Sequence, residues 1–136
     1  MNASNEPTIP DDMAYLLTTD VVATIAAHRP DGSIAQYQMW VDYDGTHVMV
    51  SSAVGSQKAR NWELNPHVSV SVVDRADPWR FVVVRGRVME RKPDTNLAHI
   101  DRTSQRYVGA PYRRRTLDRE IFLIRPDVVL VRRGRS

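Results

Sequence analysis

The sequence predicts a mostly antiparallel β-barrel with short helices at its ends. Roughly six extended runs rich in β-branched residues are separated by only two clear helical segments. Strands and helices do not alternate regularly, which disfavours a parallel sheet built from β-α-β units. Asp-Gly pairs at residues 31–32 and 44–45 lie between extended runs, and such pairs are typical of hairpin turns.

The length and composition predict one domain. With 136 residues, of which 42% are hydrophobic, the chain can bury one core. Residues 1–10 are polar and proline-containing, so we expect a flexible N-terminal arm, followed by a single domain over residues 11–136. There is no cysteine, which excludes disulfides and thiolate chemistry and suits a reducing cytoplasm. No apolar run approaches the ~20 residues that a membrane span needs, so we expect none.

The charge of the chain is modestly basic. The formal net charge is +3, and only Lys58 and Lys92 among the 19 basic residues are lysines. The arginines are scattered and accompany no helix-turn-helix, zinc-finger or RNP-like motif, so we expect no nucleic-acid partner but a preference for anionic ligands. The four histidines show no metal-ligand spacing and have no cysteine or paired carboxylate beside them, so we expect no metal.

The first half of the chain is expected to form a three-stranded meander. A short helix over residues 11–17 precedes a buried strand over 21–27. The Asp-Gly turns then connect a second strand over 34–43 and a third over 46–52. Residues 37, 39, 41 and 43 share one face of the second strand, because side chains alternate along a strand.

The second half combines two helices with three strands. Helices are expected over residues 56–64 and 94–108, and strands over 67–74, 79–91 and 120–131. Gly86 interrupts the apolar pattern of the long strand, which predicts a bulge or a close backbone approach. Residues 110–118 form an arginine-rich loop, and Gly109 is expected to end the second helix.

The stretch over residues 48–62 is the most informative for function. An apolar run enters a loop of small residues, and the loop opens into a helix that Ser56 can cap. Free amides at a helix start, small side chains and an early lysine, Lys58, suit an anion such as phosphate. The alternative is an ordinary capped surface helix with solvated charges.

No self-sufficient catalytic set is visible. The chain has no nucleophile elbow, no phosphate-binding Walker loop and no dinucleotide glycine fingerprint. If the protein is an enzyme, its reactive group is therefore expected to come from a cofactor.

The ordered series of short motifs resembles one family. It comprises Thr24-Ile25-Ala26, Met39-Trp40-Val41, Lys58-Ala59-Arg60-Asn61, Asn65-Pro66-His67, Trp79-Arg80-Phe81-Val82, Arg85-Gly86-Arg87-Val88, and Tyr107 with Gly109, Pro111 and Tyr112. This series, over residues 16–131, resembles the pyridoxamine 5'-phosphate oxidase-like, FMN-binding split β-barrel superfamily. More narrowly, it is similar to the coenzyme F420-dependent oxidoreductases of the FDOR-B type.

The resemblance implies a homodimeric split β-barrel, a six- to seven-stranded antiparallel Greek-key barrel, with the cofactor at the subunit interface. If the family's site residues are transferred to the matching positions of this chain, Lys58 would pair with the cofactor phosphate. Trp79 of the partner subunit would pack against the cofactor ring. The implied cofactor-binding residues are Gln38, Met39, Ser51, Ser52, Ser56, Gln57, Lys58, Asn61, Trp79 and Arg80. Two departures are evident: Ser56 and Gln57 stand where relatives often carry a second basic residue, and Gln36-Tyr37-Gln38 replaces a smaller, proline-containing stretch.

The function implied is hydride transfer between reduced coenzyme F420 and a small organic acceptor. The sequence identifies no catalytic group, and it leaves alternative functions open. One is an FMN-dependent oxidase or reductase on the same fold, and another is a non-catalytic F420 or flavin carrier. Turnover of the reduced cofactor separates the enzymes from the carrier.

Overall fold

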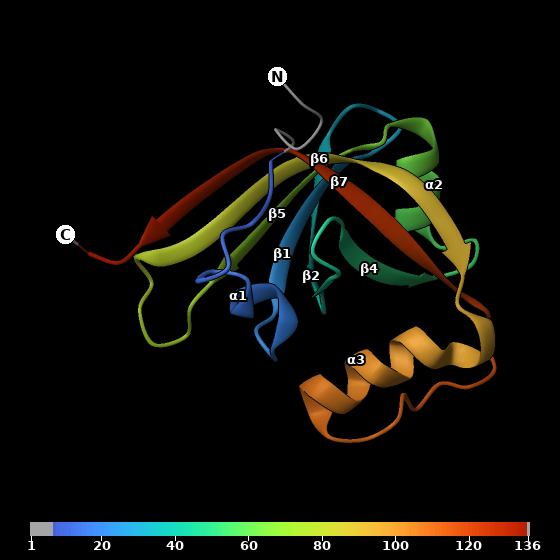
Figure 1. Cartoon of the computed structure of the whole chain (residues 1–136). Coiled ribbons are helices and arrows are strands. Elements are labelled where there is room, and N and C mark those ends of the chain that lie inside the picture. The colour runs from blue at the N-terminus through green and yellow to red at the C-terminus, as the bar shows by residue number, and fades with distance from the viewer. Residues whose placement is uncertain (1–6, 136) are drawn as a thin grey trace.

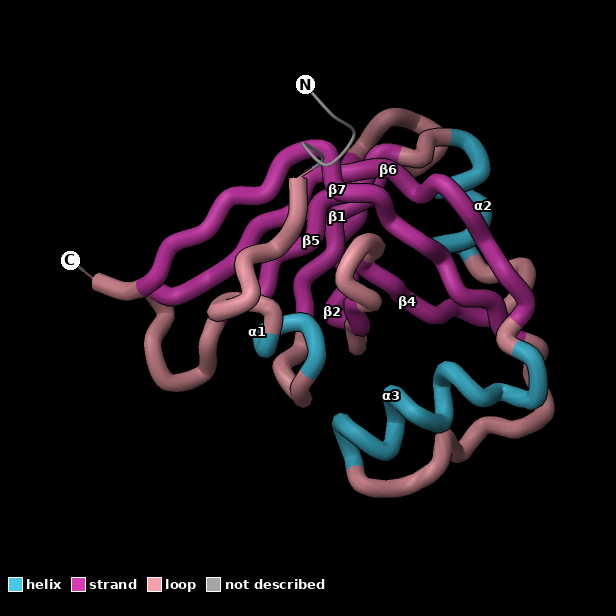
Figure 2. Tube along the Cα trace, viewed as in Figure 1, coloured by secondary structure: helices cyan, strands magenta, loops and turns pink. Residues whose placement is uncertain are grey.

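The strands form one antiparallel sheet with the order β2-β1-β5-β6-β7-β4-β3. The computed structural model describes residues 7–135 (Figures 1 and 2). The strands are β1 (Ala23–His28), β2 (Ile34–Met39), β3 (Asp42–Tyr43), β4 (Val48–Ala53), β5 (His67–Val73), β6 (Arg80–Pro93) and β7 (Arg119–Arg133). The prediction of a mostly antiparallel β protein with few helices is confirmed.

The predicted meander is wrong at its second strand. The expected strand over 34–43 breaks at Trp40 and Val41, so that β2 pairs with β1 whereas β3 pairs with β4. β2 and β3 therefore occupy opposite ends of the strand order although only two residues separate them. Two edges joined by so short a link must lie close together, so the sheet rolls up into a barrel.

β6 and β7 form a long ribbon that arches over the molecule (Figure 1). The register shifts between Arg85 and Gly86, where Gly86 lies opposite Pro126, which confirms the bulge predicted at this glycine. β4 pairs with β7 only as far as Ile124, so Pro126 lies beyond that ladder and its missing N–H breaks no pairing with β4.

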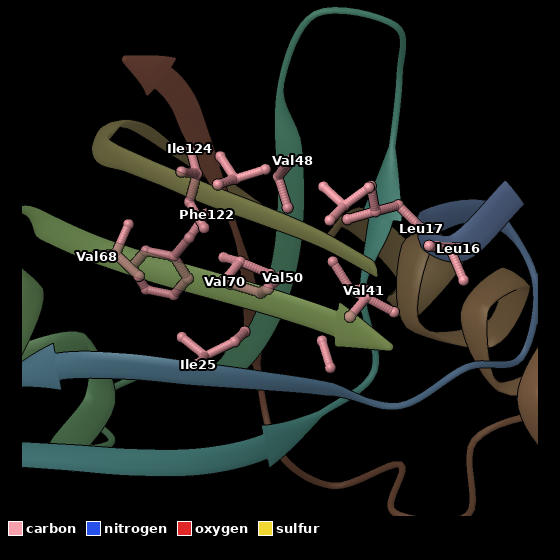
Figure 3. Close-up of a cluster of buried hydrophobic side chains, with 14 of the residues drawn as sticks. Leu16, Leu17, Ile25, Val41, Val48, Val50, Val68, Val70, Phe122 and Ile124 are labelled. Carbon is pink, nitrogen blue, oxygen red and sulfur yellow. The ribbon is translucent and has the colours of Figure 1, made fainter. Parts of the chain in front are cut away.

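The core fills the inside of the rolled sheet (Figure 3). Ile25, Val50, Val70 and Phe122 come from four strands, are at most 1% exposed and point toward one another. Every second residue of β1, β4 and β5 is buried, as alternation along a strand requires. The barrel is therefore held by side chains from strands that are distant in the sequence.

Four short helices complete the fold within residues 7–135. They are α1 (Tyr15–Thr18), α2 (Gln57–Leu64), the 3₁₀ helix η2 (Thr95–Leu97) and α3 (Ala98–Val108). In Figure 1, α2 lies at the right-hand side of the strands and α3 lies below them. No helix within residues 7–135 has the length and apolar character that crossing a membrane requires.

The start of α3 differs from the expected continuous helix over 94–108. Asn96 and Leu97 have positive φ angles of 57° and 58°, which separates η2 from α3. The buried Asp94 carboxylate accepts hydrogen bonds from the amides of His99 and Ile100, at 2.8 and 2.9 Å, and so caps the first turn of α3. The helix ends at Gly109, as predicted, with a φ of 75°.

The expected N-terminal arm lies largely outside the described residues, which begin at residue 7. Within its described part, Ile9 is only 3% exposed and belongs to the core cluster. Residue 9 is thus packed against the barrel, so the described part of the expected arm is not free of contacts.

Candidate functional site

The junction between β4 and α2 is built as the sequence predicts. Ser56 has an extended conformation, and its hydroxyl accepts a hydrogen bond from the amide of Ala59 at 3.2 Å, which caps α2. The hydroxyls of Ser52 and Ser56 lie 2.7 Å apart, which ties the cap to the end of β4. The loop and the helix start are therefore held in place by short polar side chains.

A cavity of about 410 Å³ opens beside this junction. Its size falls in the range of small-molecule sites. Six residues that the sequence assigns to cofactor binding line it: Gln38, Met39, Ser51, Ser52, Ser56 and Lys58. The remaining lining comes from the link between β2 and β3, from β4, from α3, and from the loop before β7 with the first residue of β7. It comprises Trp40, Val41, Met49, Ala53, His99, Ile100, Thr103, Tyr112, Arg114, Leu117 and Arg119.

The charge of this cavity is one-sided. Lys58, Arg114 and Arg119 line it, and no carboxylate is among its lining residues. Lys58 and Arg114 make no ion pair with any carboxylate of residues 7–135. Uncompensated positive charge at a helix start favours an anionic ligand.

Lys58 lies over an aromatic ring. Its Nζ is 4.8 Å from the centre of the Tyr37 ring, a distance at which a cation and a ring attract each other. The Tyr37 hydroxyl in turn accepts a hydrogen bond from Asn61 Nδ2 at 3.2 Å. Tyr37 therefore supports the lysine on one side and is anchored to α2 on the other.

Four predicted cofactor residues lie outside the cavity lining in this chain. Asn61 is 1% exposed, and Gln57, which is exposed, donates to its side-chain oxygen at 2.9 Å, so the two side chains are joined along α2. Arg80 donates to the Tyr15 hydroxyl at 2.8 Å and to the carbonyl of Asp12 at 3.0 Å. Trp79, which directly precedes β6, is 45% exposed and lies beside Arg132, whose guanidinium is 4.9 Å from the ring centre.

Arg119 is a cavity residue that the sequence did not indicate. Its Nε donates to Ser51 Oγ at 2.9 Å, and its guanidinium lies 4.8 Å from the centre of the Tyr112 ring. It begins β7 and pairs there with Ala53, so only the long-range register of β4 and β7 brings it to the cavity. No local signal in the sequence predicts that pairing.

One wall of the cavity comes from α3. His99 is 5% exposed, and burial lowers the pKa of its imidazole, an effect that the nearby Asp42 carboxylate opposes. Asp42 accepts from Arg106 at 2.8 Å and from Arg102 at 3.3 Å, which joins α3 to β3. Tyr107 adds a second link, because its ring stacks on Trp40 with centres 5.3 Å apart.

A larger neighbouring cavity, of about 670 Å³, shares Leu117 and Arg119 with the first. Its charges are balanced: Arg91 is paired with Glu63 and Glu120, and Arg115 is paired with Asp101. The smaller cavity therefore fits an anion better. Among residues 7–135, no three histidine or acidic side chains gather as metal ligands.

Comparison with known proteins identifies the family. The family model of pyridoxamine 5'-phosphate oxidase matches residues 9–133. The chain belongs to this family. No curated protein matches its sequence. Among solved structures, an F420 reductase is 31% identical, with a TM-score of 0.81, over 90% of this chain and 98% of the reductase.

Two more distant solved structures share the fold. A conserved hypothetical protein from Mycobacterium tuberculosis is 20% identical, with a TM-score of 0.71, over 99% of this chain and 91% of that one. A putative pyridoxamine 5'-phosphate oxidase from Listeria innocua is 16% identical, with a TM-score of 0.65, over 89% and 95%. These two likenesses concern the fold. The family model and the 31% identity to the F420 reductase place this chain in the oxidase-like superfamily that has an F420 branch.

Proposed function

We propose that this protein is a coenzyme F420-dependent oxidoreductase that holds the deazaflavin in the 410 Å³ cavity. The observation that carries the proposal is the convergence of Lys58, Ser52 and Ser56 in one cavity lined by basic residues and no carboxylate. The likeness to an F420 reductase supports this choice of cofactor. FMN is the alternative, and it is supported by the family to which the chain belongs.

The residues of the cavity fit the parts of such a cofactor. Lys58 and the amides at the start of α2 would hold the phosphate, since a helix start and an ammonium both stabilise an anion. Ser51 and Ser52 would hydrogen-bond the ribityl chain, and Met39, Trp40 and Ile100 would provide apolar surface for the ring. When bound, the reduced cofactor supplies a hydride, and the chain's own part is to position it and a small organic acceptor.

Binding of the cofactor tests this proposal. Replacing Lys58 by alanine is expected to weaken the affinity for F420, or for FMN, by about 10- to 100-fold, the range expected for losing a hydrogen bond to a charged group. Fluorescence titration measures the two dissociation constants. Turnover is then measured as oxidation of the reduced cofactor by an enone, a quinone or a nitro compound.

The chain offers a matched control, because it contains only one other lysine. Lys92 lies outside the 410 Å³ cavity and pairs with Glu90, so Lys92→Ala removes the same charge without touching the site. Equal affinities of the two variants would contradict the phosphate role of Lys58. Binding of neither cofactor by the unaltered protein would contradict the proposed function, and binding without turnover would favour the carrier.

We also propose that the protein is a homodimer joined through the outer face of the β6–β7 ribbon. Val128 and Leu130 lie on this face and are 37% and 48% exposed, whereas their neighbours Val129 and Val131 pack against the core. Trp79, at the end of the same ribbon, is 45% exposed. An apolar strip of this kind favours burial against a second copy, and a two-fold arrangement would bring Trp79 toward the partner's cofactor cavity.

Light scattering after size-exclusion chromatography tests the dimer. Leu130→Glu is expected to convert dimer to monomer, because a symmetric interface would place two carboxylates in an apolar contact. Val108→Glu introduces the same charge at a 61% exposed position at the end of α3 and is expected to leave the dimer intact. A monomeric unaltered protein, or a dimer that survives Leu130→Glu, would contradict the proposed interface.

A further inference from the structure

The imidazole of His99 lines the cavity, and the proposed function gives it no task. It lies on α3 beside two other cavity residues, Ile100 and Thr103, and is 5% exposed. No set of metal ligands surrounds it within residues 7–135. The charged groups around it are Asp42 on β3, Asp94 before η2, and Arg102 and Arg106 on α3 itself.

The contact with Arg102 fixes where the proton of His99 lies. Arg102 Nη2 is 3.2 Å from His99 Nδ1. A guanidinium has hydrogen-bond donors and no acceptor, so Nδ1 must be the acceptor. The ring is then neutral, with its proton on Nε2. Burial acts in the same direction, because it disfavours the charged form of the imidazole.

The Nε2–H group is available to a ligand. It has no hydrogen-bond partner within residues 7–135. Within residues 7–135, two side-chain polar atoms are fully enclosed and have no hydrogen-bond partner: Trp62 Nε1 and Arg106 Nε. His99 Nε2 also has no partner but is not one of these two atoms, so it is not fully enclosed. Because the residue is otherwise buried and lines the cavity, the open space beside Nε2 is the cavity itself.

We propose that His99 is a ligand-contacting residue that donates its Nε2–H to a neutral carbonyl oxygen of the molecule bound in the cavity. The inference rests on the proposed function. Trp40, Met39 and Ile100 share the lining with His99 and suit a flat, conjugated ligand. A neutral N–H among them complements a ring carbonyl of the cofactor or the carbonyl of an organic acceptor. Arg102 is the positioning residue that holds the donor tautomer.

The tautomer is tested first, by the long-range ¹H–¹⁵N NMR spectrum of the imidazole at pH 7.5. We expect the pattern of a neutral ring protonated at Nε2. In Arg102→Ala the preference is expected to weaken toward a mixture of tautomers, and the fold should persist because the Arg102 side chain is 64% exposed. A cationic ring, or a proton on Nδ1, in the unaltered protein would overturn the proposal.

Titration with FMN and with F420 tests the contact and its source. A shift of the His99 Nε2–H resonance with the cofactor alone shows that the hydrogen-bonding carbonyl belongs to the cofactor. A shift that appears only when a quinone is added to the cofactor complex shows that the hydrogen-bonding carbonyl belongs to the organic acceptor. If a cofactor binds in a manner that depends on Lys58 while the His99 Nε2–H resonance shifts neither with the cofactor nor with the quinone, this inference fails and the proposed function stands. If neither cofactor binds, both fail.

Substitutions give an independent readout by affinity. His99→Leu removes the donor and is expected to weaken binding of the responding ligand about tenfold, whereas His99→Gln keeps an N–H donor and should cost less than about threefold. His67→Gln, at an exposed position on β5, is the matched control and should leave the affinity unchanged. Equal losses for His99→Leu and His99→Gln, with melting temperatures near that of the unaltered protein, would overturn the proposal.

Discussion

Gly86→Ala is expected to lower the free energy of unfolding by about 3 kcal/mol, at the upper end of the usual cost of overpacking. A Cβ at this position would lie 2.2 Å from the carbonyl oxygen of Arg125 and 3.2 Å from Ile124 Cγ2. The obstacle is backbone of the neighbouring strand, which cannot rotate away as a side chain would. The substitution must therefore open the β6–β7 ribbon at the bulge. Denaturant unfolding followed by circular dichroism measures the loss.

Gly109→Ala separates crowding from backbone strain. Gly109 has a φ of 75° and open space around the position of a Cβ, so alanine there is strained but not crowded. A cost of about 1 kcal/mol is expected for it. If Gly86→Ala is no more destabilising than Gly109→Ala, the close approach between β6 and β7 does not govern the stability of the ribbon.

Local patterns in the sequence were sufficient to predict the elements around the site. Ser56 caps α2 as its position before the helix indicates, and the Asp31–Gly32 pair lies at the turn between the paired strands β1 and β2. Gly86 interrupts the apolar pattern of a strand in the sequence, and it lies at the bulge. Each of these features depends on residues close in the sequence, where propensity and capping act directly.

Features that depend on strand pairing were not predictable in this way. The run over residues 34–43 alternates like one strand, yet it divides at Trp40 and Val41. The ring of Trp40 stacks on Tyr107 of α3, and Val41 is 1% exposed. Tertiary contacts with a distant helix thus override a local β pattern.

The same limit applies to the cavity. Lys58, Ser52 and Ser56 lie within one continuous stretch, so the local sequence predicts them as a group. Arg119 and His99 reach the cavity from the second half of the chain. Their positions follow from the pairing of β7 with β4 and from the docking of α3. Trp79 can be assigned only through the family resemblance, and the role proposed for it requires a second subunit.

Asp42→Ala is expected to destabilise the protein by about 3 kcal/mol, because it removes one partner of a buried ion pair. Asp42 is 7% exposed, and its carboxylate accepts from Arg106 at 2.8 Å and from the amide of Tyr43 at 2.9 Å. Without it, Arg106 keeps a buried Nε that has no partner and loses its closest counter-charge. Asp127→Ala, which breaks a half-exposed pair with Arg87, should cost under about 1 kcal/mol.

The pH dependence of stability gives a second measure of the same carboxylate. Burial raises the pKa of Asp42, but the hydrogen bonds from Arg106 and the Tyr43 amide outweigh it, so the pKa lies below the usual 3.8. A lowered pKa contributes stability that is present above pH 3.8 and is lost as the pH falls through the folded-state value. Asp42→Ala should therefore lose part of the acid sensitivity of the unaltered protein below pH 3.8.

The location of the damage distinguishes a local role of Asp42 from a global one. Asp42 connects β3 to α3 through Arg102 and Arg106, whereas the β6–β7 ribbon does not depend on it. Hydrogen exchange in Asp42→Ala should thus accelerate in α3 while the amides of β6 and β7 remain protected. Since His99, Ile100 and Thr103 wall the cavity from α3, cofactor affinity should fall together with that protection. Uniform loss of protection across the sheet would show instead that the ion pair supports the barrel as a whole.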